Sequence, residues 1–304
     1  MDSQPLIVHV VIPSYNTADY LCRCLDSLRA QQGGPPLEVY VVDNASRDDS
    51  VERVRRGYPE VHLQVSERNG GFAYAVNIAL RAIQAGRAGR TDPYAVLLLN
   101  SDTELPPTTL AQMAAFMAAH PEAGAAGPQL LLADGQMDRA GRRSFPTPEV
   151  AFYRLFGLAL LFPRSRRFGR YNLTYLDPEE TAEVDAVSGA FMLVRGEVVE
   201  AVGPLDERFF FYGEDLDWAF RIKALGWKIY YYPVVKVRHW KRASSRLRAR
   251  ASLRDFYQAM RIFHRKHFAS RYPWWVNALI ELGVSVREGL ALLPYLFRQQ
   301  ERAR

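Results

Sequence analysis

The chain has 304 residues, 48% hydrophobic and 24% charged, an ordinary globular balance that supports one large α/β domain, alone or with appendages. The formal charge of +6 and pI of about 9.3 indicate an anionic partner: a phosphorylated substrate, a membrane surface or nucleic acid. Cys22 and Cys24 are too close for an unstrained disulfide and lack further zinc ligands, so we expect reduced thiols in a cytosolic protein. No window of about 20 residues is free of charge and MDSQP leads straight into LIVHVVI, so we expect neither a spanning helix nor a signal peptide.

Strands and helices alternate along the first 100 residues. Apolar, β-branched runs predict strands at 6–12, 37–43, 61–67 and 94–100. Apolar spacing of period 3.6 and capping residues predict helices from Thr17 or Asp19 through Leu28, from the Ser46–Ser50 segment onward, and from about Phe72 to Ala85. The alternation implies a Rossmann-like α/β fold with a mostly parallel central sheet and helices on both faces.

The segments that follow these four strands are polar. They read PSYN, DNASRDDS, ERNGGFA and NSDTEL, and are rich in Asn, Asp, Ser or Gly. In a parallel sheet the carboxyl ends of the strands lie at one edge, where ligands bind. We therefore expect the four segments to converge on one site.

The second half of the chain has a different pattern. Arg residues are interleaved with Phe, Tyr and Leu through 141–176. A strand and a short helix ended by Gly203 are predicted over 184–203, followed by a helix from Glu214 to about Leu225 and a strand over 227–240. From Ser252 the sequence predicts an amphipathic helical extension.

The residues at the strand ends allow two interpretations each. Asp43 suits contact with a nucleotide base or ribose, and equally an Asx turn or helix cap. The Gly70-Gly71 pair suits close backbone approach to phosphate, and equally any tight turn. Asp102, which ends a buried strand, is either a ligand of a divalent cation or a turn residue. His239 is either a second ligand or a structural hydrogen-bonding residue.

Two adjacent acids open the predicted helix at Glu214. Such acids complement the helix dipole, but one of them could also take a proton from an attacking hydroxyl. Neighbouring helical residues do not share a face, so Glu214 and Asp215 cannot do the same job. Trp218 suits stacking on a sugar ring or core packing. The small pair Ser188-Gly189 suits close approach of a ligand or tight strand packing.

Taken in order, these segments resemble the inverting glycosyltransferases of family 2, which have the GT-A fold, and among them the rhamnosyltransferase-like enzymes of bacterial polysaccharide assembly. The matching stretches cover roughly residues 7–245: VIPSYN, VVDNASRDDS, ERNGGFAYAVNIAL, LLLNSDTEL, VSGAFMLVRGEVVEAVGPLDERFFFYGEDLDWAFRIKALGWKIYYYP and HWKRAS. The resemblance implies a nucleotide-sugar-binding half at 1–120, an acceptor and catalytic half at 121–250, and a C-terminal extension at 251–304.

The resemblance also implies how the donor, a nucleotide-diphosphate sugar, is held. Asp43 would bind the base. The positions it assigns to the nucleotide are Pro13, Tyr15, Asn16, Asp43, Asn69, Gly71, Asn100, Ser101, Asp102 and Ser244. The family's metal motif is Asp-x-Asp, and here Asn100 replaces the first acid, so Asp102 would hold Mn²⁺ or Mg²⁺ with His239.

For the chemistry, the resemblance makes Asp215 the general base that deprotonates the acceptor hydroxyl. Glu214 would orient the acceptor or the base, and Trp218, Ser188 and Gly189 would contact the acceptor. The donor sugar that best fits the resemblance is L-rhamnose on deoxythymidine diphosphate, with a saccharide or lipid-linked saccharide as acceptor.

The basic and apolar segments 141–176 and 274–297, together with the high pI, favour peripheral attachment to anionic lipid at the inner face of the cell membrane. Packing of the C-terminal helix on the domain is the alternative.

Rival functions are a sugar nucleotidyltransferase, which would need a Gly-rich loop with Lys where PSYN stands, and a basic non-enzymatic module that binds nucleic acid or membrane. The acids at the strand ends argue against a nucleic-acid partner. With Asn100, a transferase that binds without turnover is a third possibility.

Overall fold

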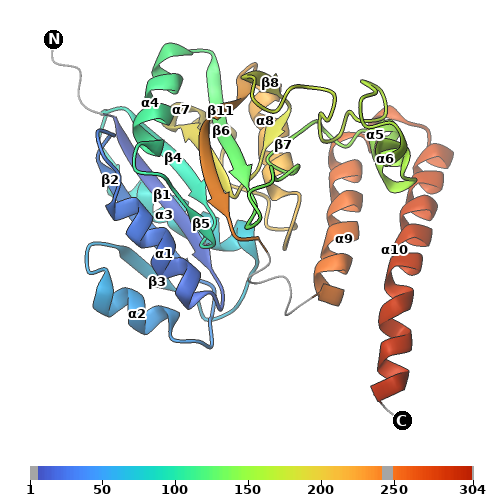
Figure 1. Cartoon of the computed structure of the whole chain (residues 1–304), viewed down its shortest axis with the longest axis horizontal. Helices are drawn as coiled ribbons and strands as arrows, with labels where there is room; N and C mark the ends of the chain where they lie inside the picture. The colour runs from blue at the N-terminus through green and yellow to red at the C-terminus, as the bar shows by residue number, and fades with distance from the viewer. Residues whose placement is uncertain (1–5, 242–248, 303–304) are drawn as a thin grey trace.

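The computed structural model describes residues 6–241 and 249–302, and a nine-stranded sheet forms its centre (Figure 1). In spatial order the strands are β3 (His62–Val65), β2 (Leu37–Asp43), β1 (Ile7–Ser14), β4 (Tyr94–Leu99), β10 (Phe191–Arg195), β6 (Ala123–Leu131), β11 (Lys228–His239) and β5 (Thr103–Glu104), with β8 (Ala182–Val184) also paired to β11. A separate two-stranded sheet joins β7 (Arg142–Arg143) to β9 (Ala186–Val187).

The strand directions bring the polar segments to one edge. β3, β2, β1 and β4 are parallel to one another, and β6 is parallel to β11. β10 lies antiparallel between β4 and β6, so its beginning meets the carboxyl ends of β1, β2 and β4. The predicted α/β fold with a mostly parallel sheet is confirmed, and the site therefore takes residues from both halves of the chain.

Helices cover both faces of the sheet, as predicted. One layer contains α1 (Ala18–Arg29), α2 (Ser50–Gly57) and α4 (Thr109–Ala119); the other contains α3 (Phe72–Gly86), α7 (Gly196–Val202) and α8 (Glu214–Ala224). Because successive side chains of a strand point to opposite faces, Val10 and Ile12 of β1 pack with the first layer and Val11 packs with the second.

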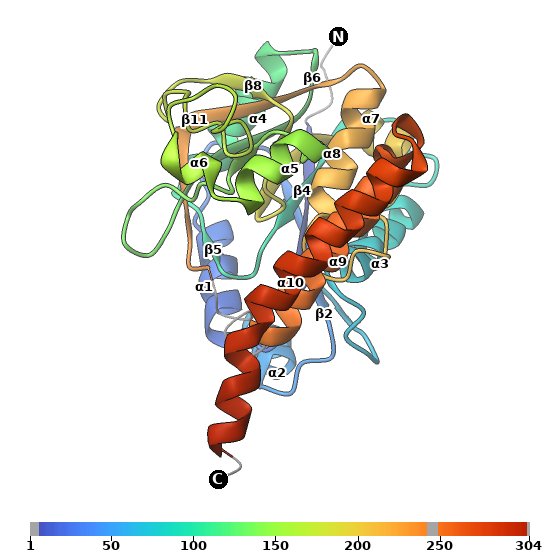
Figure 2. The ribbon, with the colours of Figure 1, turned by 90° about the vertical axis from the view of Figure 1, so that its right-hand side faces the viewer.

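The C-terminal segment forms a helical hairpin beside the sheet, made of α9 (Ala249–His267), the short 3-10 helix η2 (Ala269–Arg271) and α10 (Trp274–Arg302) (Figures 1 and 2). α5 (Pro148–Leu155) lies beside the hairpin, and α6 (Leu158–Leu161) follows it. Within the described ranges no helix has both the length and the apolar character needed to cross a membrane.

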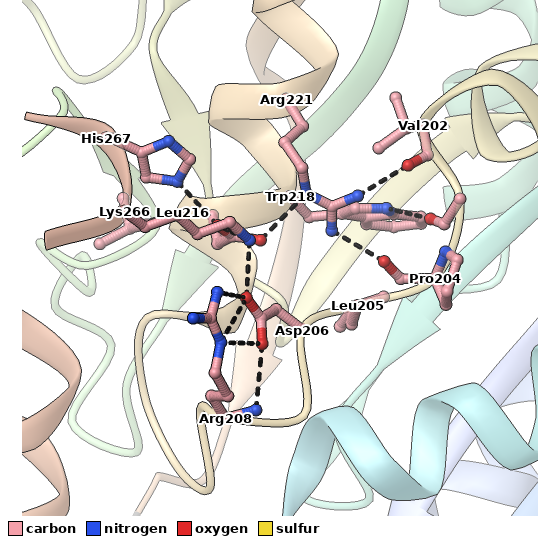
Figure 3. Close-up of polar contacts among 12 residues, drawn as sticks. Val202, Pro204, Leu205, Asp206, Arg208, Leu216, Trp218, Arg221, Lys266 and His267 are labelled. Atoms are coloured by element: carbon pink, nitrogen blue, oxygen red, sulfur yellow. Dashed lines mark hydrogen bonds and ion pairs between the residues drawn. The ribbon is translucent and has the colours of Figure 1, made fainter. Parts of the chain in front are cut away.

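A buried carboxylate fixes the hairpin to the domain. Asp217 of α8 is fully buried, and its Oδ1 lies 2.7 Å from Nε2 of His267 and 2.7 Å from Nζ of Lys266, both on α9. Lys266 also pairs with Asp206 at 2.7 Å, and Figure 3 shows this group of contacts. Phe263 of α9 packs in the same core as α8, so the first helix of the extension belongs to the domain's core.

Candidate active site

A cavity of about 440 Å³ lies at the carboxyl edge of the sheet. Most of the residues predicted to form the site line this cavity: Pro13, Tyr15, Asn69, Gly71, Asn100, Ser101, Asp102, Ser188, Gly189, Glu214, Asp215 and His239. They come from the ends of β1, β4 and β11, from the loop before α3, from the turn between β9 and β10 and from the first turn of α8.

The segment after β4 is a tight turn held by the residue that precedes β10 and the residue that follows β11. The backbone N–H of Asn100 donates to the carbonyl of Ala190 at 3.0 Å, and that of Trp240 donates to the carbonyl of Asp102 at 2.9 Å. The N–H and hydroxyl of Thr103 both donate to the Asn100 carbonyl, at 3.2 and 2.6 Å. Asp102 is thus a turn residue whose carboxylate is also held against the end of β11.

His239 lies between two carboxylates. Its Nε2 is 3.3 Å from Oδ1 of Asp102 and 3.3 Å from Nδ2 of Asn100, and its Nδ1 is 3.5 Å from Oδ2 of Asp138. Burial lowers the pKa of His239, but Asp102 and Asp138 outweigh it and raise the pKa to about 9. Asp138 in turn accepts from Nζ of Lys241 at 2.8 and 2.9 Å. Burial raises the pKa of the Asp138 carboxyl, but His239 and Lys241 outweigh burial and lower it.

This donor set fits a divalent cation that also binds substrate oxygens. Asp102 Oδ1 and His239 Nε2 are close enough to reach one ion, and Asp138 beside Nδ1 favours a proton on that nitrogen, leaving Nε2 for the metal. No group of three or more His, Cys, Asp or Glu suited to a metal occurs among the described residues. An ion held here therefore needs water or phosphate ligands to complete its shell.

The two acids of α8 have different environments. Oδ2 of Asp215 accepts from Nη2 of Arg143 at 2.6 Å and from the N–H of Gly189 at 2.9 Å, and its Oδ1 accepts from the N–H of Leu216 at 2.7 Å. In contrast, Oε2 of Glu214 is buried without a hydrogen-bond partner. Burial first, and then the charge of Asp215, raise the pKa of Glu214 to about 8. With this raised pKa, Glu214 keeps its proton at neutral pH, whereas the Asp215 carboxylate is held by three hydrogen-bond donors.

The loop before α3 is shaped by Gly71. Its φ of +92° is in the left-handed region, and a Cβ there would lie 2.3 Å from the carbonyl oxygen of Phe210. Asn44 ties this loop to the end of β2, because its Oδ1 accepts from the N–H of Gly70 at 3.0 Å and its Nδ2 donates to the Gly71 carbonyl at 2.9 Å. The Gly-Gly pair is therefore required by chain packing, and it also brings Asn69 and Gly71 to the cavity wall.

Two of the predicted nucleotide ligands, Asp43 and Asn16, are not among the residues that line the cavity. Asp43 is buried, and its Oδ1 accepts from the N–H of Ser46 at 2.9 Å as an Asx-type turn does, while its Oδ2 has no partner. The side chain of Asn16 accepts from the N–H of Arg47 at 2.7 Å. Both side chains shape the loop after β2. Ser244 lies outside the described residues.

The expectation that Trp218 contacts an acceptor is wrong. The indole is fully buried and donates to the carbonyl of Gly203 at 3.0 Å (Figure 3). Arg221 beside it donates to the carbonyls of Val202 and Pro204, at 2.7 and 2.8 Å. Because α8 is covered by the sheet on one side and by α9 on another, this part of the helix faces the core.

Sequence reasoning missed two residues of the site, Arg143 and Asp138. Arg143 is buried, is held in β7 and also donates to the carbonyl of Val187 at 3.1 Å. It was expected only as one of many Arg residues in a surface segment. The sequence around Asp138 contains no strand-end motif, so nothing there indicated that the side chain supports His239. For Arg143, the one local signal was that it belongs to a pair of basic residues at 142–143.

Both the sequence and the fold of this chain are similar to those of known proteins. The profile of the family described as "Glycosyltransferase like family 2" matches residues 5–258. The N-acetylglucosaminyl-diphospho-decaprenol L-rhamnosyltransferase of Mycobacterium tuberculosis is 30% identical over 295 residues, which is 95% of this chain and 92% of that protein. The solved structure of S. aureus TarS 1-349 in complex with UDP-GlcNAc aligns with a TM-score of 0.56 at 20% identity, over 93% of this chain and 72% of that one. The solved structure of GalNAc-T7 with UDP, GalNAc and Mn²⁺ aligns with a TM-score of 0.55 at 16% identity, over 94% of this chain and 55% of that one.

Proposed function

Since the chain belongs to the family 2-like glycosyltransferases and has the GT-A fold, it is a glycosyltransferase, and we propose that it is an inverting, metal-dependent one. It would transfer a sugar from a nucleotide-diphosphate donor to a hydroxyl group of a saccharide or lipid-linked acceptor. The observation that carries this proposal is that the anionic Asp215 and the Asp102–His239 pair line the same cavity. A base and a cation site are thus available to one bound donor.

In this proposal the donor diphosphate lies near Asp102 and His239, which would hold Mn²⁺ or Mg²⁺. A bound cation would offset the negative charge that grows on the leaving diphosphate. Asn100, Ser101 and Ser244 would contact the same end of the donor. Pro13, Tyr15, Asn69 and Gly71 would line the nucleoside part, and the unpartnered Oδ2 of Asp43 supports a contact with the base through a small loop movement.

Asp215 would be the general base. Arg143 and the N–H of Gly189 hold its carboxylate in place, and its three hydrogen bonds leave one lone pair for the acceptor hydroxyl. Glu214, protonated and without a partner at Oε2, would donate a hydrogen bond to the acceptor. Ser188 and Gly189 would leave room for the acceptor at the cavity wall.

The name of the mycobacterial relative supports L-rhamnose as the sugar and a lipid diphosphate saccharide as the acceptor. A lipid-linked acceptor would place the enzyme in the cytoplasm at the inner face of the cell membrane. Deoxythymidine diphosphate would then be the nucleotide of the donor.

A thermal-shift panel of nucleoside diphosphates with and without Mn²⁺ tests donor and metal together, because a ligand of the native state raises stability with its concentration. We expect the largest shift with deoxythymidine diphosphate and Mn²⁺, and no Mn²⁺-dependent shift in Asp102→Ala. Asp215→Asn should keep the shift and lose sugar transfer. Transfer at the wild-type rate by Asp215→Asn would reject the assigned base, and no shift with any nucleotide would reject the function.

A further inference from the structure

Three hollows lie in series from the acids to the surface. A cavity of about 630 Å³ shares Arg143, Gly213 and Lys241 with the wall of the active-site cavity. A third hollow of about 320 Å³ shares Ala151, Leu155 and Met260 with the second. The path they define starts beside Asp215 and ends between α5, α9 and α10, which lie close together in Figure 2.

The walls of this path change from charged to apolar. At the active-site end it passes Arg143 and Lys241, and then Arg154, whose guanidinium stacks over Tyr171 at 4.0 Å. Arg154 forms no ion pair with any other residue in the described part of the chain. Further out the walls are mostly apolar side chains of α5, α9 and α10, and the charged pair Arg261–Glu281 there is 3.3 Å apart and neutralises itself. Such a path matches an amphiphile with an anionic head and a hydrocarbon tail.

The outer end of the path is surrounded by exposed apolar side chains. Phe152 and Phe156 of α5 are 49% and 54% exposed, and Leu279 of α10 is 60% exposed. Trp274 at the beginning of α10 is 80% exposed, and the apolar face continues through Leu282 and beyond. Large apolar surfaces of this kind mark contact with lipid or protein. Here the surface is continuous with a passage to the catalytic acids, which a protein partner would not need.

We propose that this path binds the hydrocarbon chain of a lipid-linked acceptor, with the acceptor's phosphates near Arg154 and its sugar beside Asp215. The inference rests on the proposed transferase function and adds where the lipid lies. The hydrocarbon chain of the acceptor enters between α5 and α10, and the rest of that hydrocarbon chain stays in the bilayer. The enzyme therefore takes its acceptor from the membrane surface. Burial of each methylene group contributes about fourfold to affinity.

The test compares acceptors that carry the same sugar diphosphate on hydrocarbon chains of increasing length, each below its micelle concentration. Wild-type enzyme should show kcat/KM rising at least about tenfold from the shortest to the longest chain, since only a few methylenes need be buried. Ala151→Trp, which fills the junction of the two outer hollows, should lose this dependence on chain length. Ala159→Trp, the same substitution on α6 outside the hollows, should retain it.

Two further results would overturn the proposal. One is a wild-type kcat/KM that does not depend on chain length while transfer to every acceptor proceeds, which leaves the transferase function intact and rejects the lipid path. The other is concentration-dependent dimerisation that Ala151→Trp abolishes, which would make the apolar surface an interface between two copies. Absence of transfer to any acceptor would instead reject the proposed function itself.

Discussion

The buried proton of Glu214 gives a stability prediction with a definite sign. Its pKa of about 8 compares with an ordinary value of 4.5, so the unfolded chain releases this proton at lower pH than the folded chain does. Between these values the folded state binds more protons, and the free energy of unfolding falls as pH rises. This loss of unfolding free energy is absent below about pH 4.5 and complete above about pH 8. The difference between the two pKa values corresponds to as much as about 5 kcal/mol.

Glu214→Gln is the matched perturbation, because the amide resembles the protonated acid and cannot ionise. We expect wild-type protein to lose stability between about pH 4.5 and pH 8 relative to Glu214→Gln, measured by urea unfolding in the presence of a chelator. Glu52→Gln, at an exposed acid on α2, is the control and should follow the wild-type curve. The charge of Asp215 helps to raise the pKa of Glu214. Asp215→Asn should therefore lower that pKa and narrow the pH range over which stability is lost. Parallel curves for wild type and Glu214→Gln would show that Glu214 is charged throughout and cannot donate to an acceptor.

Two other variants test the supporting residues. Asp138→Asn should weaken Mn²⁺-dependent nucleotide binding about 10- to 100-fold by calorimetry, because the group that orients His239 is weakened, and an unchanged metal affinity would contradict that role. Arg143→Met should cost about 3–5 kcal/mol in urea unfolding by leaving Asp215 as an unpaired buried charge. The same change should cost clearly less in an Asp215→Asn background, and strictly additive losses would show that the two side chains are not coupled.

The fold could be predicted from sequence because its signals are local. The first four strands are short runs rich in apolar and β-branched residues between turn residues, and each intervening helix has its own apolar face. The insertion of β10 between β4 and β6 has no such local signal. The position of β10 depends on which strand edges remain unpaired in the folded sheet. Because β10 pairs with β4 and β6, Ser188 and Gly189 just before it reach the cavity.

The site could be predicted only where a residue belongs to a motif. Asp102, His239 and Asp215 stand in stretches that resemble known motifs, and the structure brings them to one cavity. Asp138 and Arg143 act by supporting those residues, so their position in space matters and their neighbours in sequence do not. Trp218, in contrast, was wrongly predicted to belong to the site. Helical spacing places it near Asp215, but spacing cannot tell which faces of a helix are covered, and here the indole is in the core.

The charges of the cavity support our proposal that a divalent cation binds together with the donor. Among the described residues the cationic side chains in its wall are Arg143, His239 and Lys241. Each is already paired: Arg143 with Asp215, Lys241 with Asp138, and His239 with Asp102 and Asp138. Breaking the buried pairs of Arg143 and His239 would leave uncompensated charges. Lys241 is more exposed, but moving it would take a partner from the buried Asp138, so each of these cations could neutralise an incoming diphosphate only at a cost. In the proposed site, a metal ion at Asp102 and His239 would add the missing positive charge without breaking the Arg143–Asp215 pair, and it would replace only the proton at Nε2.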